Sequence, residues 1–184
     1  VKRFAETIVE LSKGELFENI ESNNFNLTKE KYFEKTYLKT ASLFKTSSFS
    51  GCIIGGGNDE NINNLSKFGF HFGMAYQIQD DILDITSSKN KEGKPVFNDL
   101  SEGVITLPII LFLESNNYDK TLNKITGQEK DILIKKIIAS KSIEKSKKIV
   151  NFHYEKALNC LIGIPESKYK EALESIIEIS KNRV

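Results

Sequence analysis

Apolar residues recur every three to four positions along most of the chain, which is the period of a helix with one buried face. In residues 2–20, for example, Phe4, Ile8, Leu11, Leu16 and Ile20 follow this spacing. No segment of any length alternates as a strand would. Helices are predicted at residues 2–20, about 29–54, 59–86, 106–115, about 129–139, 142–162 and 166–182. The sequence therefore predicts an all-α protein built as a helical bundle.

Helix boundaries are marked by capping residues, glycine and proline. Thr28, with a glutamate at position 30, predicts a capped start for the helix that follows. The run GGGN at 55–58 predicts its end, and Asn58 or Asp59 can cap the next helix. Residues 87–103 are polar and contain glycine and proline, so we expect a long loop there, and loops of this length are often functional.

The helix at 59–86 is expected at the centre of the bundle, because it is apolar on more than one side. Gly69 and Gly73 lie four positions apart within it. A glycine inside a helix costs roughly 1 kcal/mol relative to alanine, so such a pair predicts that another helix approaches closely.

The end of this helix, YQIQDDILDI at 76–85, places three carboxylates among isoleucines. At about 100° per residue, Gln77, Asp80 and Asp84 follow one edge of the helix and Asp81 lies beside them. The isoleucines at 78, 82 and 85 point elsewhere, into packing. A face this rich in like charge is unfavourable unless a cation binds there.

Carboxylates without nitrogen or sulfur ligands suit a hard cation, Mg²⁺ before Ca²⁺. An EF-hand is excluded, since its ligands lie on a loop with a glycine at a fixed position. The alternative is an acidic patch that is solvated or paired with lysines of a neighbouring helix. Lys94, in the loop after the helix, can return over the acidic face and contact a metal-bound phosphate. Lys39, with Thr40 beside it, is a second basic candidate.

Composition narrows the function classes. The 184 residues carry 26 basic and 25 acidic side chains, so a balanced surface gives no reason to expect a nucleic-acid or membrane-surface partner. The longest apolar run, 107–113, is too short to cross a bilayer. Cys52 and Cys160 are expected as buried free thiols, which suits a reducing compartment, and no zinc site is expected. His71 and His153 are interpreted as packing residues.

Two segments together, GFHFGMAYQIQDDILDI and GKPVFNDLSEGVITLPIILFLE, resemble trans-type isoprenyl diphosphate synthases. They are similar to the family's second aspartate-rich motif, DDxxD, and to the GKPxGxDLxEGxxTLP loop after it. Upstream, KGELFE at 13–18 and YLKTASLF at 37–44 resemble the family's GE-containing and KT segments, in the same order. The long-chain polyprenyl branch is the closer likeness.

The resemblance implies a fold, a reaction and a set of site residues. Asp80, Asp81 and Asp84 would hold Mg²⁺ bound to the diphosphate of an allylic substrate. Lys39, Thr40, Gln77 and Lys94 would contact that diphosphate or its metal shell. The implied reaction is ionisation of the allylic diphosphate, followed by attack of isopentenyl diphosphate on the allylic cation. The family implies the isoprenoid synthase type of helical bundle and a homodimer.

The chain also departs from the family's pattern. The first aspartate-rich motif and the basic residues that seat isopentenyl diphosphate do not occur in the 184 residues. Phe97 replaces a usual glycine, Val104 a common lysine and Glu18 a frequent glutamine. We therefore expect residues 1–184 to be the C-terminal portion of a single isoprenoid synthase domain. The alternative is a catalytically incomplete subunit that pairs with an active synthase and modulates it; the GKP…TLP loop argues against a terpene cyclase.

Overall fold

The computed structural model describes residues 1–86, 98–116 and 127–183 of the chain. Within these ranges the secondary structure is helical and contains no strand, which confirms the predicted all-α class. The elements are α1 (Lys2–Ile20), α2 (Lys29–Thr36), the π-helix η1 (Tyr37–Ala41), α3 (Ser42–Ile54), α4 (Asp59–Thr86), α5 (Asn98–Ser101), α6 (Leu107–Ser115), α7 (Gly127–Ala139), α8 (Ser142–Asn159) and α9 (Lys168–Lys181).

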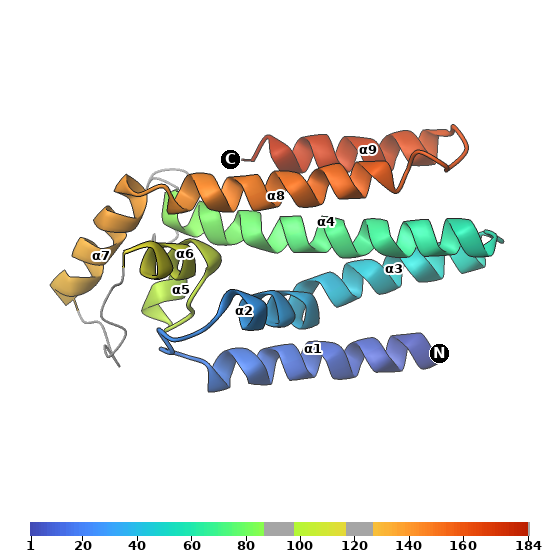
Figure 1. The fold of residues 1–184 in the computed structure, drawn as a ribbon. Helices are drawn as coiled ribbons and strands as arrows, with labels where there is room; N and C mark the ends of the chain where they lie inside the picture. The colour runs from blue at the N-terminus through green and yellow to red at the C-terminus, as the bar shows by residue number, and fades with distance from the viewer. Residues whose placement is uncertain (87–97, 117–126, 184) are drawn as a thin grey trace.

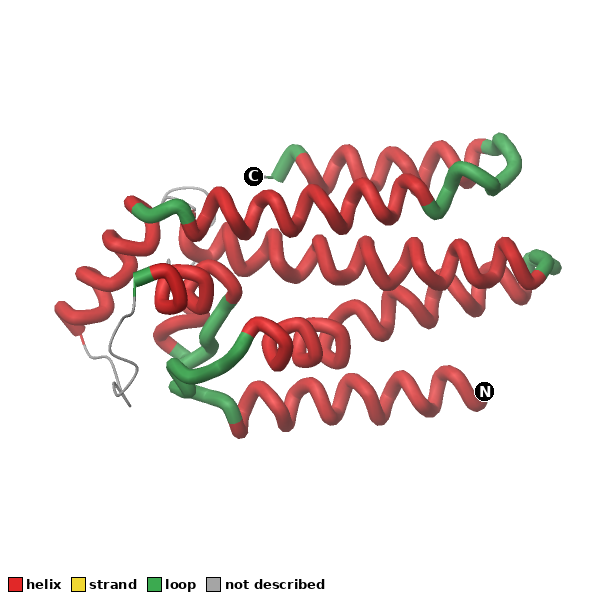
Figure 2. The backbone as a smooth tube through the Cα atoms, in the orientation of Figure 1, coloured by secondary structure: helices red, strands yellow, loops and turns green. Residues whose placement is uncertain are grey.

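The longest helix, α4, runs through the middle of the bundle, as its apolar pattern predicted (Figure 1). It packs against α3 and η1 on one side and against α8 on the other, while α1 and α9 lie outside these neighbours. The shorter α5, α6 and α7 gather at the C-terminal end of α4 (Figure 2). The core contains Ile78, Ile82 and Ile85 of α4, at 0, 0 and 5% exposure, so the predicted packing role of these isoleucines is confirmed.

Gly69 and Gly73 mark the line along which α4 meets α3 and η1. A Cβ on Gly69 would lie 2.4 Å from the Phe44 carbonyl oxygen, and one on Gly73 would lie 2.6 Å from Cα of Ala41. Both distances are far below van der Waals contact, so the close helix approach predicted from this pair is confirmed. The same approach lets α4 face η1, where two predicted site residues lie.

The predicted helix at 29–54 is interrupted by one turn of π-helix, η1. Thr28 accepts a hydrogen bond from the Lys31 amide and caps the start, as expected. The π turn falls on Tyr37–Ala41, which carries Lys39 and Thr40. The spacing of hydrophobic residues does not reveal a π turn, because the turn alters the backbone hydrogen bonding over only five residues. Turns of this kind are frequent at functional sites.

Other boundaries shift by a few residues. The Asn58 side chain accepts from the Asn61 amide at the start of α4, and Pro108 lies in the first turn of α6, both as expected. The last helix starts at Lys168 rather than at 166, because Ser167 is its capping residue and accepts from the Lys170 amide. The expected loop at 87–103 is partly wrong, since Asn98–Ser101 forms α5.

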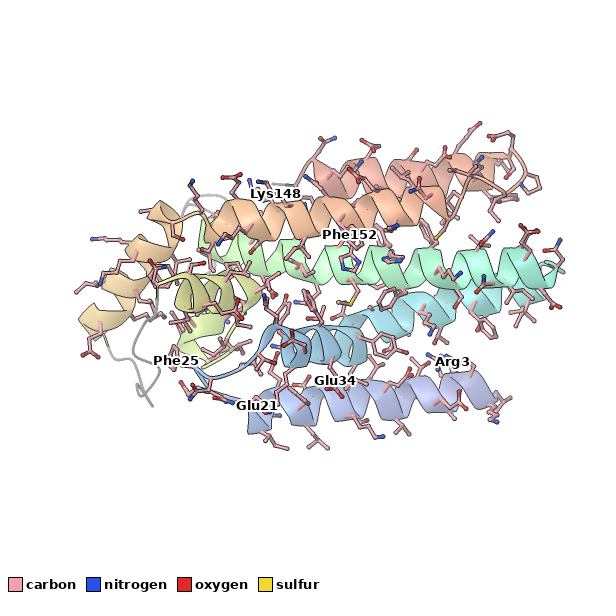
Figure 3. All side chains as sticks on the ribbon, viewed as in Figure 1. Arg3, Glu21, Phe25, Glu34, Lys148 and Phe152 are labelled. Carbon is pink, nitrogen blue, oxygen red and sulfur yellow. The ribbon has the colours of Figure 1, made fainter. Side chains whose placement is uncertain are left out.

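The ends of α1 are tied to its neighbours by polar contacts. Arg3, labelled in Figure 3, donates to Thr46 of α3 and pairs with Glu10, about two turns along its own helix. Thr7 and Thr46 share a buried hydrogen bond of 2.6 Å. These contacts fix the N-terminal half of α1 against α3, and they direct its C-terminal half towards α2 and η1.

The two histidines and the two cysteines lie mainly inside the bundle. His71 and His153 bring their Nδ1 atoms to 3.0 Å between α4 and α8. Both cysteines are free thiols; Cys52 is buried as expected, whereas Cys160 is only half-buried.

None of the helices in the described ranges is both long and apolar enough to cross a membrane.

Candidate functional site

A charged cavity of about 130 Å³ opens between the end of α1, the α2–η1 segment, the C-terminal half of α4 and the segment around α5. Its lining is almost entirely polar, in contrast to the apolar core beneath it. The lining residues are Glu18, Lys35, Thr36, Lys39, Gln77, Asp81, Asp99, Glu102 and Val104. All four motif segments quoted from the sequence therefore meet here: 13–18, 37–44, 76–85 and the described part of 93–114.

The cationic side of the cavity consists of Lys35 and Lys39, which are bridged by Glu18. One carboxylate oxygen of Glu18 lies 2.5 Å from the Lys39 ammonium and the other lies 3.1 Å from the Lys35 ammonium. Burial would raise the pKa of Glu18, but the two ammonium groups outweigh it and the pKa is lowered. The Lys35 side chain is 8% exposed, so Lys35 is a buried cation whose charge is matched by this contact.

The acidic side is built around Asp81, which is 4% exposed. Tyr32 donates a hydrogen bond of 2.5 Å to one of its oxygens, and Gln77 donates one of 2.9 Å to the other. Thr40 in turn donates to the Gln77 carbonyl at 2.6 Å, which fixes the orientation of the amide. Burial raises the pKa of Asp81 to about 6 despite these donors.

Asp99, which lines the cavity, and Asp84 beside it are further acidic groups of this region. Burial, followed by the charges of Asp81, Asp84 and Glu18, raises the pKa of Asp99 to about 7. Asp84 accepts from the backbone amides of Asn98 and Asp99 at 3.0 and 3.4 Å, and so holds the start of α5. Burial also raises the pKa of Asp84. The carboxylates thus disfavour one another's ionised forms.

Asp80 points away from this group, towards the C-terminal end of the chain. It pairs with Arg183 at 2.8 Å, and the guanidinium carbon of Arg183 lies 5.0 Å from the centre of the Tyr76 ring. The three aspartates that share a side of the helix in projection therefore have three different surroundings. The sequence could not show this, because each surrounding is made by a segment distant along the chain.

The structure brings four of the predicted site residues together: Lys39, Gln77 and Asp81 line the cavity and Thr40 supports Gln77. Asp80 and Asp84 lie on its flanks, and Lys94 falls outside the described residues. Sequence reasoning did not single out Tyr32, Lys35 or Asp99. A signal for Lys35 was present, since it lies one helical turn before Lys39 on a predicted helix. Tyr32 gave no such signal, because an aromatic residue on a helix usually packs in a core.

The donor set fits a hard divalent cation in part. Within the described ranges, no three acidic, histidine or cysteine side chains converge closely enough to hold a metal ion by themselves. Mg²⁺ needs only one or two carboxylates when substrate phosphates and water complete its shell. Burial raises the pKa of both Asp81 and Asp99, and neighbouring carboxylates raise each of them further; a bound cation would offset both effects. Asp81 with Asp80 or Asp84 would be the protein's contribution.

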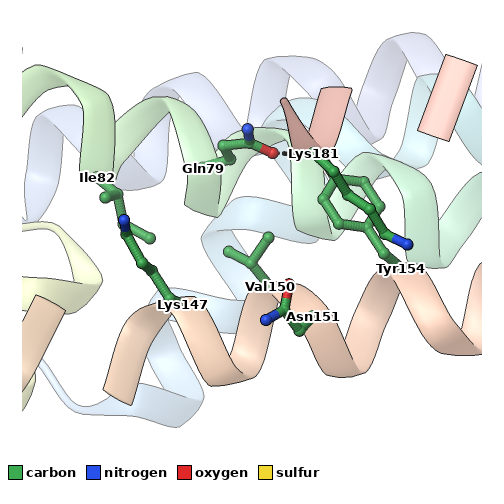
Figure 4. A pocket seen from close by; sticks show the side chains of 7 residues that line it. All are labelled: Gln79, Ile82, Lys147, Val150, Asn151, Tyr154 and Lys181. Carbon is green, nitrogen blue, oxygen red and sulfur yellow. Dashed lines mark hydrogen bonds between the residues drawn. The ribbon is translucent and has the colours of Figure 1, made fainter. Parts of the chain in front are cut away.

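The opposite side of α4 faces a second cavity, of about 160 Å³, between α4, α8 and α9 (Figure 4). Gln79 is 1% exposed there; it accepts from the Tyr154 hydroxyl and donates to the Ser180 carbonyl. Lys147 and Lys181 line the cavity beside apolar side chains. Gln79 joins α4 to α8 and α9 and leaves no polar atom of its own without a partner.

These features define an all-helical protein whose central helix presents an aspartate-rich stretch to a cavity with a lysine side. A family model described as polyprenyl synthetase matches residues 1–141. A prenyl transferase of Cyanophora paradoxa is 34% identical over 187 residues, covering 100% of this chain and 58% of the relative. Component 2 of the heptaprenyl diphosphate synthase of Bacillus subtilis is 34% identical over 176 residues, covering 94% of this chain and 51% of the relative.

The chain belongs to the polyprenyl synthetase family. The crystal structure of the heptaprenyl diphosphate synthase from Staphylococcus aureus matches the fold with a TM-score of 0.92 at 33% identity, over 99% of this chain and 59% of that one. The isoprenoid synthase bundle predicted from the sequence is thereby confirmed. The chain spans little more than half the length of the relatives and structures it matches.

Proposed function

We propose that the chain supplies the diphosphate-binding part of a Mg²⁺-dependent prenyltransferase. The enzyme would condense an allylic diphosphate with isopentenyl diphosphate into a longer polyprenyl diphosphate. The observation that carries the proposal is the cavity, in which Lys35 and Lys39 face Asp81 and Asp99 across a space bordered by Gln77. Relatives named as prenyl transferases and as polyprenyl diphosphate synthases support it.

The reaction begins with cleavage of the allylic C–O bond, so the charge that must be stabilised is the one that develops on the departing diphosphate. Mg²⁺, held by Asp81 together with Asp80 or Asp84, would supply Lewis-acid stabilisation of that charge. The ammonium of Lys39 would face the same charge, with Lys94 proposed to approach from the loop after α4. Thr40 orients Gln77, and Tyr32 and Gln77 orient Asp81, so the chain's own residues position the groups that bind.

The test is made on the complete natural protein with farnesyl diphosphate. Calorimetric titration should show saturable binding that requires Mg²⁺, and Asp80→Ala should lower prenyl-chain synthesis by about 100-fold or more. Glu60→Ala, which removes an exposed carboxylate from the first turn of the same helix, serves as the matched control. Undiminished synthesis by Asp80→Ala, with circular dichroism showing both variants folded, would show that the metal role proposed for this residue is wrong.

A second candidate is a catalytically incomplete subunit that pairs with an active synthase and modulates its product. It is favoured by the relative named as component 2 of a heptaprenyl diphosphate synthase. The two candidates separate when the natural protein is assayed by itself. Chain synthesis without any added protein eliminates the second candidate.

We also propose that the protein self-associates as a homodimer. Support comes from the outer side of α1, where Phe4, Ile8, Leu16 and Ile20 are 53 to 80% exposed. Apolar side chains grouped on one surface helix commonly mark a surface that is covered in the assembled protein. Sedimentation equilibrium of the natural protein tests this, and a monomer at micromolar concentration would contradict it.

A further inference from the structure

Glu18 holds the two lysines of the cavity in the way that an anionic ligand would. Its carboxylate gives one oxygen to Lys39 at 2.5 Å and the other to Lys35 at 3.1 Å. A phosphate group bridges two ammonium groups through the same kind of charge-assisted hydrogen bond. The Glu18 side chain is only 19% exposed, so water screens these contacts weakly.

The two lysines differ in what they can do when a ligand arrives. Lys35 is 8% exposed and is held between Glu18 and the ring of Tyr32, 5.7 Å from its centre. Lys39 is 34% exposed, lies on the π turn, and has a second, weaker partner in Glu15 at 3.3 Å. Lys39 is therefore the ammonium able to turn towards a ligand, whereas Lys35 keeps Glu18 in place.

The cavity has more acidic than basic side chains, so the pairing of Glu18 with Lys39 weakens the binding of an anion. Among its described lining residues the acidic groups are Glu18, Asp81, Asp99 and Glu102, against Lys35 and Lys39. A diphosphate would meet lysines that are already paired with Glu18, and it would add negative charge to a site with an excess of carboxylates. It must either displace the Glu18–Lys39 contact or bring additional cations.

We infer that Glu18 is an internal competitor of the diphosphate, a positioning residue that sets the affinity of the site and its dependence on Mg²⁺ through its hold on Lys39. The inference rests on the proposed function, since it assumes that this cavity takes a diphosphate. Its ligand class is a diphosphate group, for which inorganic pyrophosphate is the simplest probe.

The experiment is calorimetric titration of the complete natural protein with inorganic pyrophosphate at low and high Mg²⁺. Glu18→Gln keeps the size and one acceptor oxygen of the side chain but removes the charge. We expect it to bind pyrophosphate roughly tenfold more tightly at low salt, with the gain shrinking as salt or Mg²⁺ rises. Glu21→Gln is the matched control, because Glu21 follows at the end of the same helix and pairs with Lys31 outside the cavity. Its pyrophosphate affinity should equal that of the unchanged protein.

Loss of the charge leaves Lys35 buried without its anion, so the melting temperature of Glu18→Gln is measured first. If that variant does not fold, the comparison is made with Lys35→Met, in which no buried ammonium needs a partner. The double variant Glu18→Gln/Lys35→Met should then bind more tightly than Lys35→Met.

Equal or weaker binding after loss of the Glu18 charge overturns the inference alone. Absence of pyrophosphate binding in every variant at high Mg²⁺, including the unchanged protein, overturns both the inference and the proposed diphosphate site. A gain equal to that of Glu21→Gln would show a general effect of surface charge, and would also overturn the inference.

Discussion

Gln77 and Gln79 lie two residues apart on α4 and have the same side chain, yet they belong to two different regions of the molecule. Gln77 is half-buried at the charged cavity, where it accepts from Thr40 and donates to Asp81. Gln79 is 1% exposed on the opposite side, where it joins Tyr154 of α8 to the last turn of α9. On one side of α4, carboxylates and lysines gather around a cavity, whereas on the other side Gln79 forms its hydrogen bonds with uncharged partners.

This difference shows how one helix serves both a site and a core. On the side of Gln79, hydrogen bonds between neutral partners stabilise the fold. On the cavity side, buried carboxylates with raised pKa values are kept together at a cost in stability, which is typical of functional sites. Variants whose stability and ligand affinity are both measured can therefore test whether one side of α4 serves binding and the other serves packing.

The largest expected effect comes from Gly14, whose missing side chain lets α1 approach η1. A Cβ at this position would lie 2.6 Å from the Lys39 amide nitrogen and 2.8 Å from its Cα. We expect Gly14→Ala to lower the free energy of unfolding by about 3 kcal/mol, since backbone must move to admit the methyl group. It should also weaken pyrophosphate binding, because η1 carries Lys39.

The control for Gly14→Ala is Gly51→Ala in α3, where an added Cβ meets no atom within 4 Å. That change should stabilise the protein by about 0.5 to 1 kcal/mol through higher helix propensity. Urea denaturation measures both variants. A Gly14→Ala protein as stable as the unchanged one would show that α1 does not position the lysine side of the cavity.

An intermediate effect is expected from the two glutamines themselves. Gln79→Leu removes two hydrogen bonds from a buried network, so the free energy of unfolding should fall by about 2 kcal/mol while pyrophosphate affinity is retained. Gln77→Leu should cost less than about 1 kcal/mol, because the side chain is half-buried, but should weaken pyrophosphate binding several-fold. Urea denaturation and calorimetry on the same two proteins make the measurement. If Gln77→Leu lost more stability, and Gln79→Leu lost more pyrophosphate affinity, the proposed division of α4 into a binding side and a packing side would be wrong.

A pH dependence from the α4–α8 contact is expected to be smaller than the effect of Gln79→Leu. Burial, followed by the charge of His71, lowers the pKa of His153 to about 4. The pKa of His71 is also lowered, first by burial and then by the charges of Lys156 and Lys67. A base with a lowered pKa binds more protons when unfolded. Its contribution is therefore complete above about pH 6.5 and is lost as pH falls towards 4.

We expect that loss to be about 1.5 kcal/mol, taking roughly half of the full shift because the ring is partly reached by solvent. His153→Gln, which can still hydrogen-bond to His71, should flatten the stability profile between pH 6.5 and 4.5. Comparing it with the unchanged protein cancels the titration of the carboxylates. Parallel profiles for the two proteins would show that the histidine pair does not respond to pH.

Much of the fold could be predicted, because it depends on local patterns. The period of apolar residues located the long helices, Thr28 and Asn58 marked helix starts, and Gly69 with Gly73 marked the closest helix contact. The π turn was not predictable, since it changes no hydrophobic position by more than one residue.

Many residues of the candidate site could be predicted from the sequence, but their arrangement in space and their hydrogen-bond partners could not. The aspartates were recognised from their spacing, but their partners Tyr32, Asn98 and Arg183 lie 49, 14 and 103 residues away. A single sequence contains no record of which distant segments meet. The structure brings some of these residues together, but the binding roles of the whole set stay predictions: Lys39, Thr40, Gln77, Asp80, Asp81, Asp84 and Lys94.

The π turn at Tyr37–Ala41 has a consequence for how this segment can change in length. A π turn contains one residue more than an α turn, and each residue of a helix turns the chain by about 100°. Deleting a single residue here would restore a regular helix and rotate α2 against α3, which would carry Tyr32 away from Asp81 and Lys35 away from Glu18. Related sequences can therefore exchange side chains in this segment far more readily than they can gain or lose a residue within it.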